Sequence, residues 1–374
     1  MAPPKPSAKS SKTPASKNKS QKKSVTARSE AKPDQLPPPA IPLELQQLLL
    51  NVFRNAFPER LGPELKPLLQ EVKQHLYNRD FLHAFGKDEY LEVYALRWSP
   101  SRALGYAQIF DDLSEYLVQE LGSVAKDAPR RIVCLGGGAG AEIVGLAGYL
   151  KLLERKNVLK QVASSDDTEK TVEGAPSTPH FDVVAIDIAN WSSIVAGLQQ
   201  AITTPPTLSK YASAAAKEAN VELLQPDVLQ TRFVQQDVLT MPLEDLSREL
   251  KDTTVVTLMF TLNELYSTSL AKTQSFLLRL TGSLQPGALL LVVDSPGSYS
   301  SVTLNGAEKK YPMHWLLDHT LLSTPQGAKP QDADAKWEKL LSDESKWFRL
   351  PEGLKYPIEL ENMRYQIHLY RRLP

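Results

Sequence analysis

The sequence predicts an α/β fold with a doubly wound parallel sheet, because apolar strands alternate with amphipathic helices over residues 130–294. A glycine turn separates the first strand from the helix that follows it, as is usual where such a sheet binds a nucleotide. The chain has 374 residues, of which 42% are hydrophobic, so it can bury a large core. We therefore expect one large α/β domain with additions.

Five apolar segments have the length and composition of buried strands, at 130–135, 181–188, 232–235, 253–260 and 288–294. Helical periodicity occupies 141–154, 192–200 and 264–281, and the alternating segment 364–371 predicts a closing strand. Residues near 155–180 and 201–230 break this rhythm and are interpreted as insertions. The sheet domain is accordingly placed at 126–374.

A helical section, placed at residues 41–125, precedes the sheet. Leucine and valine recur at helical spacing over 43–56, and similar patterns follow at 63–85 and 101–121. Aromatic and arginine side chains gather at 94–106 (YALRWSPSRALGY), where Ser99 and Pro100 predict a bend before a new helix. Two interpretations fit this segment: a capped helix start with Trp98 in the core, or a lid or loop that contacts the substrate.

A basic tail is predicted at residues 1–40. Its first 32 residues contain nine lysines and arginines and one acidic residue, Glu30, so the formal net charge of zero combines a basic tail with a net acidic body. The tail has almost no large apolar side chains, and we expect it to be disordered. It is either a nuclear or nucleolar address or non-specific RNA tether, or a solubilising extension.

Composition excludes several classes of protein. The sequence has no run of 18 apolar residues and no apolar N-terminal segment, which argues against a membrane span and a secretory signal. Cys134 is the sole cysteine and the six histidines are scattered, so neither a disulfide nor a zinc pattern is present. We expect a soluble protein of a reducing compartment, without a metal.

The turn at 136–140 (GGGAG) is the first candidate ligand site. Gly136, Gly138 and Gly140 lack side chains, so backbone amides can approach a nucleotide closely. Together with Ala141 the turn also satisfies the dinucleotide pattern G-x-G-x-x-G/A, so it does not identify the ligand by itself. A tight turn without a ligand is the remaining alternative.

Acidic residues end the next two strands. Asp187 follows the second strand, where a carboxylate can accept hydrogen bonds from both ribose hydroxyls of an adenosine. Asp237 follows the third strand with Val238 beside it, and this aspartate could accept a hydrogen bond from the adenine amino group. A helix cap or loop aspartate is the alternative for Asp237.

Polar residues also follow the fourth and fifth strands. Asn263 and Glu264 come after the fourth strand and Asp294 ends the fifth, so we assign these three to the catalytic edge. Asn263 could alternatively serve only as a helix N-cap. Three features favour S-adenosylmethionine over a nicotinamide cofactor. They are Asp237 after the third strand, Asn263 and Glu264 after the fourth, and the closing strand at 364–371.

Several strings resemble the fungal 25S ribosomal RNA uridine-N3 methyltransferases from about residue 42 to the end. They are YALRWSPSRALGY, RIVCLGGGAGAEIVGL, FTLNELY, VVDSPGSYS, YPMHWLLDHTLL and MRYQIHLYRR. The resemblance implies a Rossmann-like seven-stranded methyltransferase sheet, S-adenosylmethionine as cofactor, and ribosomal RNA or a pre-ribosome as partner. It also implies a nuclear or nucleolar location, with the cytoplasm as a further option; a monomer is favoured.

Such an enzyme must grip RNA and remove a proton from uracil N3. We assign substrate binding to Tyr94, Arg97, Trp98 and Arg102, with Tyr94 or Trp98 stacking on an extruded base. Glu264 or Asp294 would take the proton. Further basic patches are Lys309–Lys310 and Arg371–Arg372. The alternatives are a methyltransferase of a protein or small molecule, a non-catalytic ribosome-assembly factor with this fold, and a nicotinamide-dependent dehydrogenase.

Overall fold

The computed structural model describes residues 41–124, 128–163, 180–208, 210–218, 220–297, 299–304, 307–322 and 335–374. All of them belong to one compact unit, Pro39–Pro374. The basic tail expected at 1–40 and most of the insertion expected near 155–180 lie outside the described residues.

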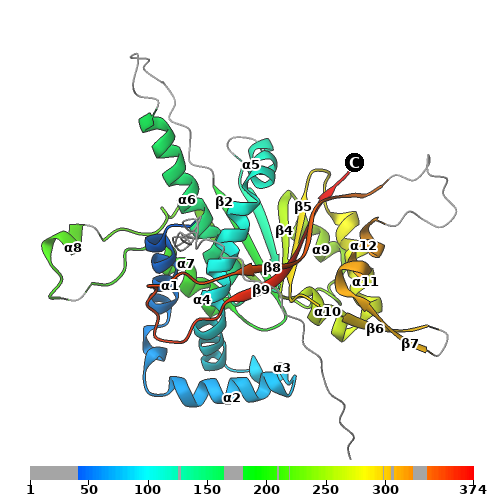
Figure 1. Cartoon of the computed structure of the whole chain (residues 1–374), viewed down its shortest axis with the longest axis horizontal. Helices are drawn as coiled ribbons and strands as arrows, with labels where there is room; N and C mark the ends of the chain where they lie inside the picture. Colours follow the sequence, from blue (N-terminus) through cyan, green and yellow to red (C-terminus); the bar gives the residue numbers. More distant parts are fainter. Residues whose placement is uncertain are drawn as a thin grey trace, which may run out of the picture. The chain divides into compact units, whose positions relative to one another are not determined.

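A seven-stranded sheet forms the centre of this unit (Figure 1). Its strand order is β3-β2-β1-β4-β5-β9-β8. The strands are β1 (Arg130–Leu135), β2 (Phe181–Asp187), β3 (Leu229–Gln235), β4 (Thr253–Met259), β5 (Leu289–Asp294), β8 (Trp337–Phe348) and β9 (Met363–Arg372). Strands β1 to β5 are parallel, and β9 is antiparallel to both β5 and β8. The predicted doubly wound sheet and its closing strand are therefore confirmed.

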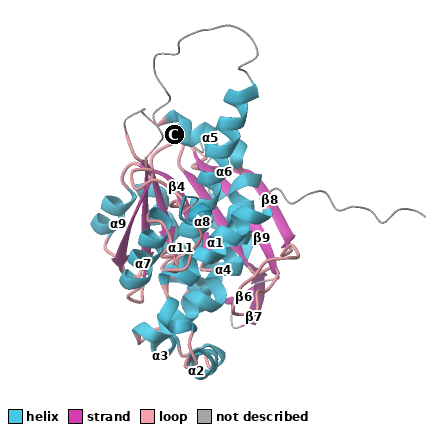
Figure 2. Cartoon of the chain, turned by 90° about the vertical axis from the view of Figure 1, so that its left-hand side faces the viewer, coloured by secondary structure: helices cyan, strands magenta, loops and turns pink. Residues whose placement is uncertain are grey.

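Helices cover both faces of the sheet (Figure 2). On one face lie α1 (Leu43–Ala56), α4 (Asp88–Asp112), α6 (Ala141–Ala163) and α7 (Ser192–Thr203); on the other lie α9 (Leu243–Leu250), α11 (Leu270–Ser283) and α12 (Met313–Leu322). Successive strand residues serve opposite faces, as Val183 packs in the first core and Val184 in the second. The near-continuous apolar strands follow from this burial on both sides.

Shorter elements complete the unit. They are η1 (Pro58–Leu61), α2 (Leu65–Tyr77), α3 (Phe81–Ala84), α5 (Ser114–Ser123), α8 (Ala214–Glu218), α10 (Leu262–Thr268) and a hairpin of β6 (Tyr299–Leu304) and β7 (Ala307–Pro312). The sequence did not predict the hairpin or β8. The helix expected at 264–281 is two helices, because the Ser269 hydroxyl caps a new helix by accepting a hydrogen bond from the Lys272 amide.

The bend expected at Ser99 and Pro100 is wrong, since α4 runs through both residues. A proline inside a helix leaves the carbonyl four residues earlier without its amide donor. Here that carbonyl belongs to Leu96, and it accepts a hydrogen bond from the Tyr356 hydroxyl at 3.0 Å. A partner from outside the helix therefore lets α4 continue, and α4 packs against α6 in the core under the sheet.

Within the described residues, no helix has both the length and the apolar character needed to cross a membrane.

Candidate functional site

The glycine turn lies where the order of the sheet reverses. Connections from β1 and β4 leave toward opposite faces, so the carboxyl ends of these neighbouring strands form a crevice, the usual ligand position in such sheets. Gly136, after β1, has a φ of 79°, and a Cβ on it would lie closer than 3.0 Å to the side chain of Thr261, after β4. The turn therefore needs glycine both for its backbone conformation and for this close approach.

Asp187 lies beside this turn, at the end of β2. Its carboxylate accepts hydrogen bonds from the backbone amides of Gly138 at 3.2 Å and Ala189 at 3.3 Å. Burial raises the pKa of Asp187, while these amides and the Trp191 indole lower it. The carboxylate thus holds the glycine turn against β2, and its predicted contact with a ribose stays a prediction.

Asp237 and Val238 follow β3 at the same edge. Asp237 accepts hydrogen bonds from the Leu239 amide at 2.9 Å and the Thr240 hydroxyl at 3.0 Å, which is the arrangement of a loop aspartate that stabilises its own turn. Val238 is buried in the second core. Ile188, directly after Asp187, is 66% exposed, and sequence reasoning did not select it. A large apolar side chain left open beside Asp187 is suited to contact a flat ring.

An aromatic cluster that the sequence did not predict packs against Gly138 of the glycine turn. Trp191 is buried, and a Cβ on Gly138 would come closer than 3.0 Å to its indole. The Trp191 ring centroid lies 5.3 Å from that of Phe85 and 5.6 Å from that of Tyr94, and Tyr94 lies 4.7 Å from Trp98. The aromatic part of the helical section thus reaches the turn. Trp98 is half-buried inside α4, so the predicted capped helix start is wrong, and its contact with a substrate stays a prediction.

The three predicted catalytic residues lie together. Asp294 is buried at the end of β5 and accepts a 2.9 Å hydrogen bond from the backbone amide of Asn263 and a 2.7 Å bond from that of Ser295. Asn263 is the second residue of α10, so the alternative that it caps this helix is wrong. The carboxylate of Asp294 instead accepts the hydrogen bond from the backbone amide of Asn263. Burial raises the pKa of Asp294 to about 6, although these two amides and the Arg102 charge lower it.

Glu264 points toward the helical section rather than into the core. Its carboxylate forms an ion pair with the Arg79 guanidinium at 3.3 Å, and its side chain is 45% exposed. Arg79 follows α2 and has a φ of 56°, a left-handed conformation that cannot continue a right-handed helix. The helix expected at 63–85 is therefore divided into α2 and α3. Glu264 also raises the pKa of Asp294 through charge repulsion, so the two carboxylates are electrostatically coupled.

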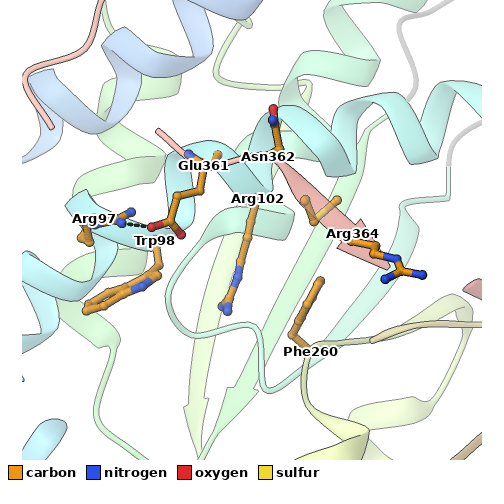
Figure 3. A pocket seen from close by; sticks show the side chains of 9 residues that line it. Arg97, Trp98, Arg102, Phe260, Glu361, Asn362 and Arg364 are labelled. Atoms are coloured by element: carbon orange, nitrogen blue, oxygen red, sulfur yellow. Dashed lines mark hydrogen bonds and ion pairs between the residues drawn. The ribbon is translucent and has the colours of Figure 1, made fainter. Parts of the chain in front are cut away.

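A cavity of about 170 Å³ opens beside Arg102, whose guanidinium interacts electrostatically with Asp294 (Figure 3). Its lining combines residues of α4, the end of β4 and the start of β9: Arg97, Trp98, Ser101, Arg102, Phe260, Glu361, Asn362, Met363 and Arg364. Three of the four predicted substrate-binding residues thus line it, and the fourth, Tyr94, accepts a hydrogen bond from Arg102 at 3.2 Å. A cavity of about 150 Å³ holds one benzene ring, so this one has room for a single pyrimidine.

Arg102 and Phe260 form the floor of the cavity. The Arg102 guanidinium lies 4.9 Å from the Phe260 ring centroid and interacts electrostatically with Asp294. Phe260 has a φ of 56°, which is unfavourable for a bulky side chain and is found mainly where function or packing demands it. The sequence showed Phe260 only as the last residue of a strand, and nothing local indicates its backbone conformation. Arg97, by contrast, is held at the wall by an ion pair with Glu361.

A buried acid beneath the glycine turn also escaped sequence reasoning. Glu142, in the first turn of α6, accepts a hydrogen bond from the Thr257 hydroxyl of β4. Burial raises its pKa to about 8, and the charge of Asp187 adds to this effect, while the Thr257 hydrogen bond lowers the pKa. Glu142 is therefore protonated at neutral pH and links the turn to the strand on which the catalytic edge is built.

These residues fit an adenosine-containing cofactor. The crevice offers the carboxylate of Asp187 and the open side chain of Ile188. An acceptor for a ribose and an apolar surface for a purine are what such a molecule needs. Among the described residues, no group of three or more His, Cys, Asp or Glu could hold a metal ion.

Comparisons with known proteins show the family of the chain. A family model described as SAM-dependent methyltransferase matches residues 53–371. The chain is 33% identical over 332 residues to the 25S rRNA (uridine(2843)-N(3))-methyltransferase of Saccharomyces cerevisiae, covering 87% of this chain and 85% of that relative.

Solved structures of methyltransferases are similar at low sequence identity. A SAM-dependent methyltransferase from Methanosarcina mazei has 11% identity and a TM-score of 0.34, covering 67% of this chain and 95% of its own. One from Clostridium acetobutylicum has 10% identity and a TM-score of 0.32, with coverages of 80% and 100%. The strand order of the sheet, and not these scores, defines the fold.

Proposed function

The chain belongs to this family of S-adenosylmethionine-dependent methyltransferases, and we propose that it methylates N3 of a uridine in large-subunit ribosomal RNA. Membership confirms the enzyme class, the cofactor and the resemblance expected from the sequence, and it removes the nicotinamide-dependent dehydrogenase as an alternative. The proposal for the substrate is supported by the name of the yeast relative and by the cavity beside the catalytic edge.

The cofactor would lie over the glycine turn. Gly136, Gly138 and Gly140 would give backbone access, Asp187 would accept hydrogen bonds from the ribose, and Asp237 and Val238 would face the adenine. Ile188 is added to this set because its apolar side chain is open to solvent beside Asp187. When bound, S-adenosylmethionine supplies a methyl group made electrophilic by the sulfonium.

One observation carries the choice of a uracil base: the Arg102 guanidinium lies on the Phe260 ring, with Asp294 electrostatically coupled to it. Uracil N3 lies between two carbonyl oxygens and must lose its proton to bond the methyl group. Asp294 or Glu264 would accept this proton, and Asn263 would orient Asp294 by donating a hydrogen bond from its backbone amide. Arg102 would stabilise the negative charge that then spreads onto the carbonyl oxygens.

The surrounding residues position the base and exclude water. The Arg102 guanidinium, which lies over the Phe260 ring, would provide the flat surface for a pyrimidine, and Trp98 lines the wall beside it. Tyr94 would act behind the wall by orienting Arg102 through its hydroxyl. The pairing edge of the base reaches such a cavity only when the nucleotide is unpaired, so the substrate would be single-stranded or extruded at this position.

The test is incubation of the purified chain with labelled S-adenosylmethionine and large-subunit RNA from a strain that lacks the protein, followed by nucleoside analysis. Label in 3-methyluridine is the expected result. Label in protein, in a small molecule or in another nucleoside would overturn the substrate assignment. Binding of the cofactor and the RNA without any transfer would instead indicate a non-catalytic assembly factor.

We further propose that a pre-ribosome is the partner and the nucleus or nucleolus the compartment, with the tail at 1–40 as the candidate address. The division into a tail, a helical lid section at 41–125 and a methyltransferase domain at 126–374 belongs to the same proposal. Fluorescence microscopy of the full chain and of a chain that begins at residue 41 would test the compartment and the role of the tail. We expect the chain without the tail to lose its nuclear accumulation.

A further inference from the structure

An exposed tryptophan with two arginines against it lies at the rim of the site; we call Trp347, Arg349 and Arg364 the Trp347 patch. Trp347 is 50% exposed on the edge strand β8. The Arg349 guanidinium lies 4.7 Å and that of Arg364 lies 5.7 Å from its ring centroid. A large aromatic side chain so exposed, with cations attached, is typical of a binding surface rather than of a core.

Topology places the patch at the same edge of the sheet as the glycine turn. Strand β9 is antiparallel to β5 and β8 is antiparallel to β9, so β8 ends where the parallel strands end. Trp347 is near that end and pairs across the strands with Arg364, at the start of β9. Arg364 also lines the cavity, and its guanidinium points away from the other labelled side chains (Figure 3), so this residue is where the patch adjoins the cavity.

The patch carries positive charge that no carboxylate balances among the residues that the structure describes. Arg349 and Arg364 are both exposed and form no ion pair there, and the Arg364 guanidinium donates hydrogen bonds to the Ser345 hydroxyl at 3.0 and 2.9 Å. Arg371 differs, because it pairs with Glu120 at 2.9 Å, and it belongs to the opposite end of β9. The predicted Arg371–Arg372 patch is therefore less suited to hold a polyanion than this one.

We propose that the Trp347 patch binds the single-stranded RNA that flanks the target nucleotide. A base would stack on the indole while Arg349 and Arg364 contact the neighbouring phosphates of the RNA strand. The aromatic ring and the two cations thus match the bases and phosphates that alternate along a single strand. An acidic peptide would use the arginines but would leave the exposed indole without a matching flat group, so RNA fits better. The inference rests on the proposed function and extends it from the target base to its neighbours.

The first test measures the affinity of the full chain for a uridine-rich single-stranded RNA by fluorescence anisotropy, without cofactor. We expect Trp347→Ala to weaken binding about tenfold, the usual loss for one stacked base, and Trp347→Phe to retain most of the affinity. Tyr211→Ala is the matched control, since Tyr211 is 83% exposed with Lys210 5.0 Å from its ring centroid, outside the cavity lining. Wild-type affinity of Trp347→Ala, or a Phe variant as weak as the Ala variant, would overturn the proposal.

The second test uses salt. Each lost phosphate contact should reduce the slope of log affinity against log salt by about 0.7 for a single strand. We expect this reduction for Arg364→Gln and for Arg349→Gln; unchanged slopes in both would refute the phosphate contacts even if a tryptophan variant failed to fold.

These readouts separate the inference from the proposed function. RNA binding that depends on Trp347, without 3-methyluridine in the wild-type product, would refute the activity and keep the patch. If Trp347→Ala forms 3-methyluridine normally, with unchanged affinity and unchanged KM for RNA, the activity stands and the patch is refuted.

Discussion

The hydroxyl of Tyr356 donates a 3.0 Å hydrogen bond to the carbonyl of Leu96, the acceptor that Pro100 leaves without its helical donor. Tyr356 lies in the connection between β8 and β9, whereas Leu96 is in the middle of α4. A few residues along, the Ser101 hydroxyl accepts a 3.0 Å hydrogen bond from the Glu361 amide. The same connection therefore supports α4 where Arg97, Trp98 and Arg102 project into the cavity.

We expect Tyr356→Phe to lower the free energy of unfolding by about 1–2 kcal/mol, because the Leu96 carbonyl then lacks a partner in a buried position. Pro100→Ala restores the amide donor of the helix, so in that background the same change should cost clearly less. Denaturant unfolding of both single variants and the double variant measures this coupling. Equal costs in both backgrounds would show that the hydroxyl does not replace the missing helical donor.

The strands and the glycine turn could be predicted because their causes are local. Burial on both faces requires continuous apolar runs, and the 130–135 and 253–260 segments show it directly. The turn at Gly136 requires a positive φ and no side chain, which the residue type reveals. Asn263 and Asp294 were placed together because parallel strands end at one edge.

Features that depend on distant partners could not be predicted. Pro100 indicates a helix break unless Tyr356 is known to satisfy Leu96. Strand β8 lies at the sheet edge with mostly exposed or half-exposed side chains, so its sequence lacks the apolar run of a buried strand. The pairing of Trp347 with Arg364 depends on that unrecognised strand. The left-handed conformation of Phe260 likewise has no local signature.

Gly138→Ala should abolish measurable binding of S-adenosylmethionine in calorimetry. Its Cβ would come closer than 3.0 Å to the indole of Trp191, which is buried among other aromatic rings and has no space to move. Gly282→Ala is the control, because a Cβ at Gly282 meets nothing within 4 Å, and alanine favours the helix by up to about 1 kcal/mol. Unimpaired cofactor binding by Gly138→Ala would mean that the glycine turn does not form the cofactor site.

Glu142→Gln should remove a pH dependence of stability. The pKa of Glu142 is about 8 in the folded chain and ordinarily 4.5, so the unfolded chain releases this proton first as the pH rises. The free energy of unfolding then falls between about pH 4.5 and pH 8, by at most about 1.4 kcal/mol per pH unit. Denaturant unfolding over this range should show wild type losing stability relative to Glu142→Gln; parallel profiles would mean that Glu142 ionises normally.

The pH profile of methyl transfer should identify the proton acceptor. If Asp294 takes the uracil proton, kcat/KM rises with pH and levels off above its pKa of about 6, and Asp294→Asn loses about a hundredfold together with the rise. Glu264→Gln should then keep the rise and shift its midpoint downward, since Glu264 raises the pKa of Asp294. Loss of transfer in Glu264→Gln but not in Asp294→Asn would assign the role to Glu264, and full transfer in Glu264→Gln excludes it.

Arg102→Gln should slow transfer to uridine about a hundredfold, because the cation that stabilises the deprotonated uracil is lost. The deficit should shrink on RNA that carries 5-fluorouridine at the target, since fluorine makes N3–H more acidic and the anion needs less support. Affinity for S-adenosylmethionine, measured by calorimetry, serves as the control and should not change. If Arg102 only held the base in place on Phe260, both substrates would suffer equally, and an equal deficit would therefore contradict charge stabilisation.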